Sequence, residues 1–245
     1  MHFRQIPLLI ILCIYNSYGL FAFDKNKDST GLFYIVHKPE VKSEHPAVLI
    51  LLHGYGGTEQ NLYNMAVTYL PKDLLIVSAR GPITLSEGSY AWCHVSVVKG
   101  ERIMNADEAE ESRKLISNMI NEVNAKYHTD TQRVYLLGFS QGSRMSYAVG
   151  LTEPEKIKGV AILSGSLSEE VKPMVATEKK LKHTSWFISH GTYDDVISLE
   201  KAQKSRDFLI QKGIRPEYHE YPMGHEIQPK VIEDLKNWIA KMETK

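Results

Sequence analysis

Apolar runs rich in branched residues alternate with amphipathic segments along most of the chain, beginning after a polar stretch that ends at Thr30. Short apolar runs have the length of buried strands, and the intervening segments have the period of helices. The pattern predicts seven strands, at Leu32–His37, Ala47–Leu52, Leu74–Ser78, Arg133–Gly138, Gly159–Leu163, Trp186–Ser189 and Pro216–Tyr221. It also predicts helices at Glu59–Leu70, Ala106–Tyr127, Gln141–Gly150, Leu199–Lys212 and Pro229–Met242.

This alternation of strand and helix is typical of an α/β fold with a mostly parallel central sheet and helices on both faces. Leu49, Ile50, Leu51 and Leu52 are apolar without alternation, as expected of a strand that is covered on both sides. One connection, Ala79–Met104, is unusually long and shows no sustained period. Loops of this length in a compact domain are mostly functional or mobile.

The first 22 residues differ from the rest of the chain. A short start with Arg4 precedes an apolar run from Ile6 to Tyr15, and small residues follow, which is the order of a secretory signal peptide. Cleavage after Gly19 and after Ala22 both fit. An uncleaved anchor is disfavoured because the run is well short of the ~20 residues that span a bilayer. The sequence therefore predicts an exported protein with a single domain over residues 23–245.

Composition narrows the classes of partner. The chain has 29 basic and 29 acidic residues, and removal of the leader takes away Arg4 and no acid. Such a balance does not favour nucleic acid or stable membrane insertion of the mature chain. The leader also contains Cys13, so Cys93 would stand alone, without a disulfide partner or a cysteine cluster for a metal.

The motif Gly138-Phe139-Ser140-Gln141-Gly142 matches G-x-S-x-G and lies between a predicted strand and a predicted helix. In that context the motif forms a sharp turn that holds the serine oxygen clear of the sheet. A serine hydroxyl needs a base to take its proton and a carboxylate to orient that base. Ser140 is therefore the candidate nucleophile.

Candidate partners follow in the chain order serine, acid, histidine, which is the order that accompanies a serine turn of this type. His225 follows the last predicted strand in a glycine-containing turn, and Asp194 and Asp195 follow the strand before it. The residues alone leave the choice between these two acids open, with Glu226 a weaker candidate beside the histidine. Among other histidines, His94 is ambiguous, whereas a structural hydrogen-bonding role is expected for His53 and His190.

A glycine-rich turn, Leu52-His53-Gly54-Tyr55-Gly56-Gly57, follows the second predicted strand. Its glycines allow backbone N–H groups to approach a bound oxyanion closely. Combined with a serine turn, it predicts an oxyanion hole formed by the backbone N–H groups of Tyr55 and Gln141.

At this point the residues resemble the phospholipase/carboxylesterase family of α/β-hydrolases, which includes acyl-protein thioesterases. The matching segments cover Ala47–Lys241 and are Leu51–Gly57, Tyr90–Trp92, Leu137–Gly142, Leu163–Gly165, His190–Ile197 and Gly224-His225. The resemblance implies hydrolysis of carboxylic esters or thioesters without a cofactor, no large lid, and Asp194 as the acid. It also implies an acyl groove flanked by the loop that contains Trp92.

Two departures from the family concern the substrate. Asp195 stands where proline is usual, and Cys93 replaces an aromatic residue, which would reshape the groove beside Trp92. A small-molecule or lipid acyl ester is the expected substrate, with a lysophospholipase or an esterase of polysaccharide-linked acyl groups as alternatives. A non-catalytic secreted binding protein of the same fold is the alternative from another class. The sequence leaves the acyl length, the leaving group and the oligomeric state open.

Overall fold

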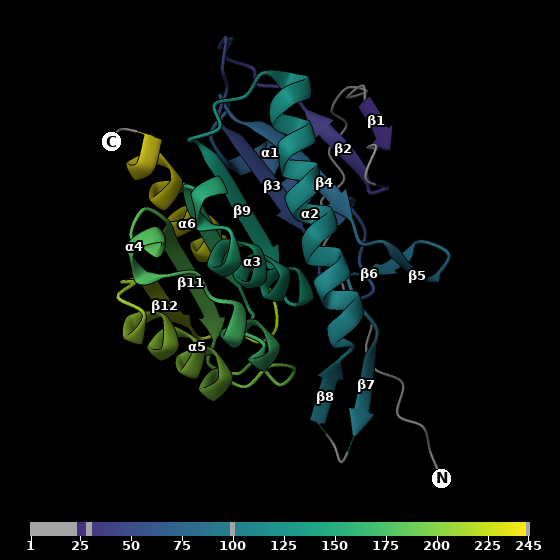
Figure 1. Ribbon diagram of the computed structural model, residues 1–245, viewed down its shortest axis with the longest axis vertical. Helices are drawn as coiled ribbons and strands as arrows, with labels where there is room; N and C mark the ends of the chain where they lie inside the picture. Colours follow the sequence, from purple (N-terminus) through teal and green to yellow (C-terminus); the bar gives the residue numbers. More distant parts are fainter. Residues whose placement is uncertain (1–23, 28–30, 99–100, 244–245) are drawn as a thin grey trace.

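The computed structural model describes residues 24–27, 31–98 and 101–243, so the predicted signal peptide lies outside the described residues. Its centre is an eight-stranded sheet with the order β1-β2-β4-β3-β9-β10-β11-β12 (Figure 1). β2 runs antiparallel to β1 and β4, and the remaining neighbours are parallel. The strands are β1 (Asp24–Lys27), β2 (Phe33–His37), β3 (Val48–Leu52), β4 (Leu75–Arg80), β9 (Val134–Phe139), β10 (Gly159–Leu163), β11 (Ser185–Gly191) and β12 (Glu217–Tyr221).

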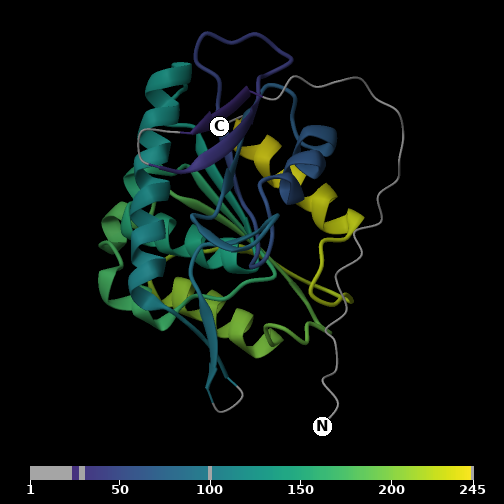
Figure 2. The ribbon, with the colours of Figure 1, turned by 90° about the vertical axis from the view of Figure 1, so that its right-hand side faces the viewer.

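Helices cover both faces of this sheet, as Figure 2 shows from the side. One face carries α2 (Ala106–Tyr127), α3 (Gln141–Thr152) and α5 (Leu199–Gln211), and the other carries α1 (Gln60–Tyr69) and α6 (Pro229–Glu243). Successive residues of β3 alternate between the two cores: Ile50 packs with the first group and Leu51 with the second. Short helical segments complete the chain, namely η1 (Pro154–Lys156), η2 (Glu169–Met174) and α4 (Glu178–Leu181).

The seven predicted strands and five predicted helices are confirmed, with ends that differ by at most two residues. The expectation of a long loop over Ala79–Met104 needs a correction. That connection, called the hairpin segment below, contains two small antiparallel hairpins, β5 (Ile83–Ser86) with β6 (Ser89–Ala91) and β7 (Val95–Val98) with β8 (Glu101–Met104). Such short, half-exposed strands lack the sustained apolar period on which the prediction depended.

The parallel arrangement determines where a site can form. The carboxyl ends of β3, β9, β10, β11 and β12 meet at one edge of the sheet, and in open α/β sheets ligands bind at that edge. The segments singled out in the sequence, which contain Tyr55, Ser140, Asp194 and His225, all follow these strand ends.

Candidate active site

Ser140 occupies a strained turn between β9 and α3. Its backbone has φ 54° and ψ −113°, which is unusual for a residue with a side chain. The turn is possible because its neighbours are small: a Cβ on Gly142 would lie 1.9 Å from the carbonyl oxygen of Leu52, and one on Gly138 would lie 2.3 Å from that of Gly142. Close packing therefore requires glycine on both sides of Ser140.

Three side chains from separate strand ends form one hydrogen-bonded chain. His225 Nε2 lies 2.8 Å from Ser140 Oγ, and His225 Nδ1 lies 2.7 Å from Asp194 Oδ2. A carboxylate beside Nδ1 holds the proton on that nitrogen, so Nε2 is the acceptor that faces the serine hydroxyl. The ring of Phe139 packs against that of His225, with centroids 5.0 Å apart.

Asp194 is buried, and its second oxygen is also occupied. Asp194 Oδ1 accepts hydrogen bonds of 2.9 Å from the backbone N–H groups of Val196 and Ile197. Burial alone would raise the pKa of this carboxyl, but the hydrogen bonds from His225 and these amides outweigh it and lower the pKa. Asp195 is exposed and has no hydrogen bond to His225, so the structure brings only Asp194 to the histidine.

The structural roles expected of His53 and His190 are confirmed by their hydrogen bonds. His53 lies between two backbone groups, with Nδ1 2.7 Å from Gly54 O and Nε2 2.9 Å from Gly81 N. His190 Nε2 lies 2.8 Å from Ile197 O and 3.4 Å from Asp194 Oδ2, and so holds the loop that carries the acid. Burial is the main cause of the lowered pKa of both rings, and it keeps them neutral.

The remaining candidate histidine, His94, is exposed and contacts the start of α2. Its backbone N–H and its Nδ1 both lie within hydrogen-bond distance of the Glu108 carboxylate, at 2.7 and 2.9 Å. His94 therefore connects the base of the β7–β8 hairpin to α2, and within the described ranges it makes no hydrogen bond to Ser140, His225 or Asp194.

Two backbone amides beside Ser140 are available for an oxyanion. Gln141 is the first residue of α3, where helical N–H groups have no partner within the helix, and no acceptor is recorded for the N–H of Tyr55 among the described residues. The turn that contains Tyr55 lies against the nucleophile, because a Cβ on Gly54 would lie 3.2 Å from Ser140 Cβ. Both predicted amides thus flank the same serine.

The expectation that Trp92 and Cys93 line an open groove needs a correction, because both side chains are fully buried. The Gln141 side chain joins them to α3: its Oε1 accepts from Trp92 N at 2.9 Å, and its Nε2 donates to Cys93 O at 2.7 Å. Trp92 Nε1 in turn donates to His53 O at 2.8 Å. Both residues support the serine turn from beneath and offer no surface to a substrate.

Two serines near the site were not identified from the sequence. Ser143 Oγ donates to the carbonyl of Gly138 and accepts from Leu163 N, so it connects the serine turn to β10. Ser164, at the end of β10, is buried and has φ 49°. Ser164 lies in Leu163–Gly165, one of the segments that resemble the family, and this resemblance was the signal for it. Within the described ranges, no group of three or more histidine, cysteine or acidic residues is arranged to hold a metal.

The protein belongs to the α/β-hydrolase class, as defined by its mostly parallel sheet, its strained serine turn and the three hydrogen-bonded side chains. Comparison with known sequences makes the assignment narrower. Residues 35–243 match the sequence model of the Phospholipase/Carboxylesterase family, and the chain belongs to that family.

Relatives and solved structures agree with this assignment. The chain is 27% identical over 219 residues to an acyl-protein thioesterase 1 of Emericella nidulans, covering 81% of this chain and 91% of that protein. It is 28% identical over 165 residues to the carboxylesterase SOBER1 of Arabidopsis thaliana, covering 65% and 72%. Its fold resembles the crystal structure of the Bacillus cereus carboxylesterase, with a TM-score of 0.74 at 23% identity, covering 86% and 94%.

Proposed function

We propose that this protein is a serine hydrolase that cleaves carboxylic esters or thioesters through an acyl-enzyme, with Ser140, His225 and Asp194 as its catalytic triad. The observation that carries the proposal is the unbroken hydrogen-bonded chain from Ser140 Oγ through His225 to Asp194, at a serine with a positive φ. Membership of a family of esterases and thioesterases supports the same chemistry.

In this mechanism, Ser140 Oγ attacks the acyl carbonyl while His225 Nε2 takes the hydroxyl proton. Asp194 keeps the imidazole oriented and stabilises the imidazolium that forms. The backbone N–H groups of Tyr55 and Gln141 donate to the tetrahedral oxyanion, and each such donor contributes on the order of 3 kcal/mol in the transition state. His225 then protonates the leaving group. In the second half of the reaction, His225 takes a proton from a water that attacks the acyl carbonyl and returns it to Ser140 Oγ as the bond to the acyl group breaks, which frees the carboxylic acid.

Kinetics on nitrophenyl and thioester substrates of increasing acyl length test this proposal. Ser140→Ala and His225→Ala should each lower kcat by roughly 10⁶-fold, and the double variant should lose little more, because the two act as a unit. Circular dichroism of the variants serves as the folding control. Turnover that survives Ser140→Ala would remove the proposed nucleophile. The same length series separates a short-acyl esterase from an enzyme of long lipid chains.

We also propose that the protein is exported. This proposal rests on the predicted signal peptide, residues 1–22, which lies outside the described residues. Among the residues that are described, no helix combines the length and the apolar character needed to cross a bilayer. N-terminal sequencing of protein recovered from a secreting host tests export. Mature chains should begin at residue 20 or 23, and chains that keep Met1 would contradict the proposal.

A further inference from the structure

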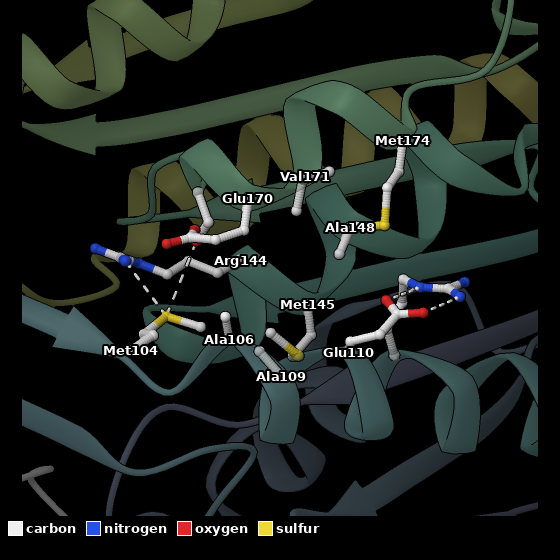
Figure 3. A pocket seen from close by; sticks show the side chains of 12 residues that line it. Met104, Ala106, Ala109, Glu110, Arg144, Met145, Ala148, Glu170, Val171 and Met174 are labelled. Atoms are coloured by element: carbon white, nitrogen blue, oxygen red, sulfur yellow. Dashed lines mark hydrogen bonds and ion pairs between the residues drawn. The ribbon is translucent and has the colours of Figure 1, made fainter.

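A narrow hollow lies one helical turn from the proposed nucleophile, between the start of α2, the first turns of α3 and η2 (Figure 3). It has about 380 Å³ of open space, part of which belongs to the surrounding solvent. Its lining includes Met104, Ala109, Arg144, Met145, Ala148 and Val171.

Two arginines line this hollow, and their surroundings differ. Arg113 is saturated, because Glu110 accepts from its Nε and Nη2 at 2.7 and 2.8 Å and Glu153 accepts from its Nη1. Arg144 has one recorded side-chain contact, from Nη1 to the thioether sulfur of Met104 at 3.3 Å. Figure 3 shows this contact at one end of the hollow and the Glu110 ion pair at the other.

Arg144 has no carboxylate within ion-pair distance among the described residues, although it is half buried. Burial lowers its pKa, the Cys93 thiol and the Glu170 carboxyl act in the opposite direction, and Arg102 lowers the pKa further; Glu170 and Arg102 are both exposed. A guanidinium presents five donors in a fixed fork that matches a carboxylate or a phosphate, and a thioether is a weak acceptor. Keeping such a cation partly desolvated without an anion is unfavourable.

The position of Arg144 connects it to the reaction. Its backbone N–H donates to the carbonyl of Ser140 at 3.4 Å, and four residues advance a helix by about 6 Å. Gln141, between the two, holds the backbone of Trp92 and Cys93, which lead directly into the hairpin that ends at Met104. Arg144 therefore lies one helical turn along α3 from the proposed nucleophile, beside the hairpin that Gln141 joins to the serine turn.

We propose that Arg144 is a specificity-determining residue that binds an anionic group, a carboxylate or a phosphate, carried by the ester or thioester substrate. This inference rests on the proposed function and adds the chemical class of the substrate to it. Arg144 takes no part in bond cleavage: its guanidinium pairs with the anion and thereby sets which substrates are aligned for attack by Ser140.

The test compares kcat/KM for nitrophenyl monoesters of dicarboxylic acids, from succinate to suberate, with neutral nitrophenyl esters of equal length. A second pair of esters compares an alcohol part that carries a phosphate with a neutral alcohol part of equal length. Together the two pairs show whether Arg144 recognises an anion on the acyl group or on the leaving group. The wild type should prefer the anionic member of one pair. Arg144→Met should reduce that preference about 10- to 100-fold, the range of a charged hydrogen bond, and Arg144→Lys should retain part of it.

Arg102→Gln is the matched control, because it removes a nearby but exposed positive charge. Its effect on the preference should stay below about twofold owing to screening by salt. Two results would overturn the proposed role of Arg144 and leave the proposed function intact. The first is a wild type that cleaves neutral esters without preferring anionic ones, and the second is an Arg144→Met variant that slows both members of a pair equally.

Calorimetric binding of the free dicarboxylates gives a readout that does not depend on turnover. The wild type should bind one of them, and Arg144→Met should weaken that binding by a similar factor. Absence of any difference between the two would overturn the proposal. A wild type that cleaves no ester or thioester while still binding dicarboxylates through Arg144 would overturn the proposed function instead.

Discussion

The strand-end loops and the hairpin segment meet at Gln141, yet they are built in opposite ways. At the strand ends, Ser140, Asp194 and His225 come from β9, β11 and β12, and neighbouring backbones approach so closely that an added Cβ would overlap them. In the hairpin segment, four short strands pair with one another, apart from one bridge between Gly57 and Tyr90. The exposed apolar side chains of Val97, Val98 and Ile103 belong to this segment.

This difference separates two tasks of the molecule. The reacting groups are held where packing permits one arrangement, which keeps the distances between Ser140, His225 and Asp194 fixed. In the hairpin segment, β8 contributes Met104 beside Arg144, and the side chains of Val97, Val98 and Ile103 in β7 and β8 are exposed. Sequence changes in β7 and β8 can therefore alter the surroundings of Arg144 without disturbing these distances.

The largest effect on kcat in this comparison is expected at Asp194, the proposed catalytic acid. Asp194→Asn should lower kcat about 10⁴-fold, because an amide no longer holds the His225 proton on Nδ1. Asp195→Asn, on the exposed neighbour, should leave kcat within about twofold. Steady-state kinetics of the two variants decides the matter, and a more damaging Asp195 change would show that the wrong carboxylate has been assigned.

A pair of glycines compares packing in the two regions. Gly142→Ala places a Cβ 1.9 Å from the carbonyl oxygen of Leu52, so it should cost at least ~4 kcal/mol of unfolding free energy or prevent folding. In Gly88→Ala, in the β5–β6 turn, the added Cβ has no atom within 4 Å. The positive φ of 70° is then the only source of strain, and it should cost about 1–2 kcal/mol of unfolding free energy. Urea unfolding measures both, and equal losses would refute the contrast.

His53 lies where the two regions join, and it makes their junction sensitive to acid. Burial lowers its pKa from 6.5 to about 4, and protonation would turn Nε2 from acceptor to donor against the N–H of Gly81. Because the folded pKa is depressed, the unfolded chain binds more protons between these values. Stability is therefore lost as the pH falls from about 6.5 to about 4, by roughly 3 kcal/mol.

Nuclear magnetic resonance of the His53 ring tests this directly. Its titration midpoint in the folded protein should lie near 4. A midpoint near 6.5, or a free energy of unfolding that does not change across this window, would contradict the buried, neutral ring.

The smallest effect concerns Cys93, whose thiol should not react in the folded protein. Burial raises the pKa of its thiol to about 12, so little thiolate exists at neutral pH. Iodoacetamide at pH 8 should leave Cys93 unmodified in the folded protein and alkylate it in urea. Rapid alkylation under native conditions, followed by mass spectrometry, would show that this part of the hairpin segment opens.

The same contrast explains what could be predicted from the sequence. Buried strands such as Gly159–Leu163 are short apolar runs that alternate with amphipathic helices along the chain, and G-x-S-x-G acquires meaning from the strand and helix around it. The fold and the site candidates could therefore be predicted from the sequence. The contact between His225 and Asp194 was inferred from chain order and family resemblance. The pairing of β7 with β8 and the burial of Trp92 depend on tertiary neighbours, which no local pattern encodes. The same holds for Arg144, which has no carboxylate within ion-pair distance in the described part of the chain.

The central claim is that Ser140 is activated by His225, and covalent labelling tests it most directly. A fluorophosphonate probe, followed by mass spectrometry, should modify one residue of the wild type, Ser140. Labelling should disappear in Ser140→Ala and slow by several orders of magnitude in His225→Ala. A wild type that stays unlabelled, or a label that persists in Ser140→Ala, would contradict the account.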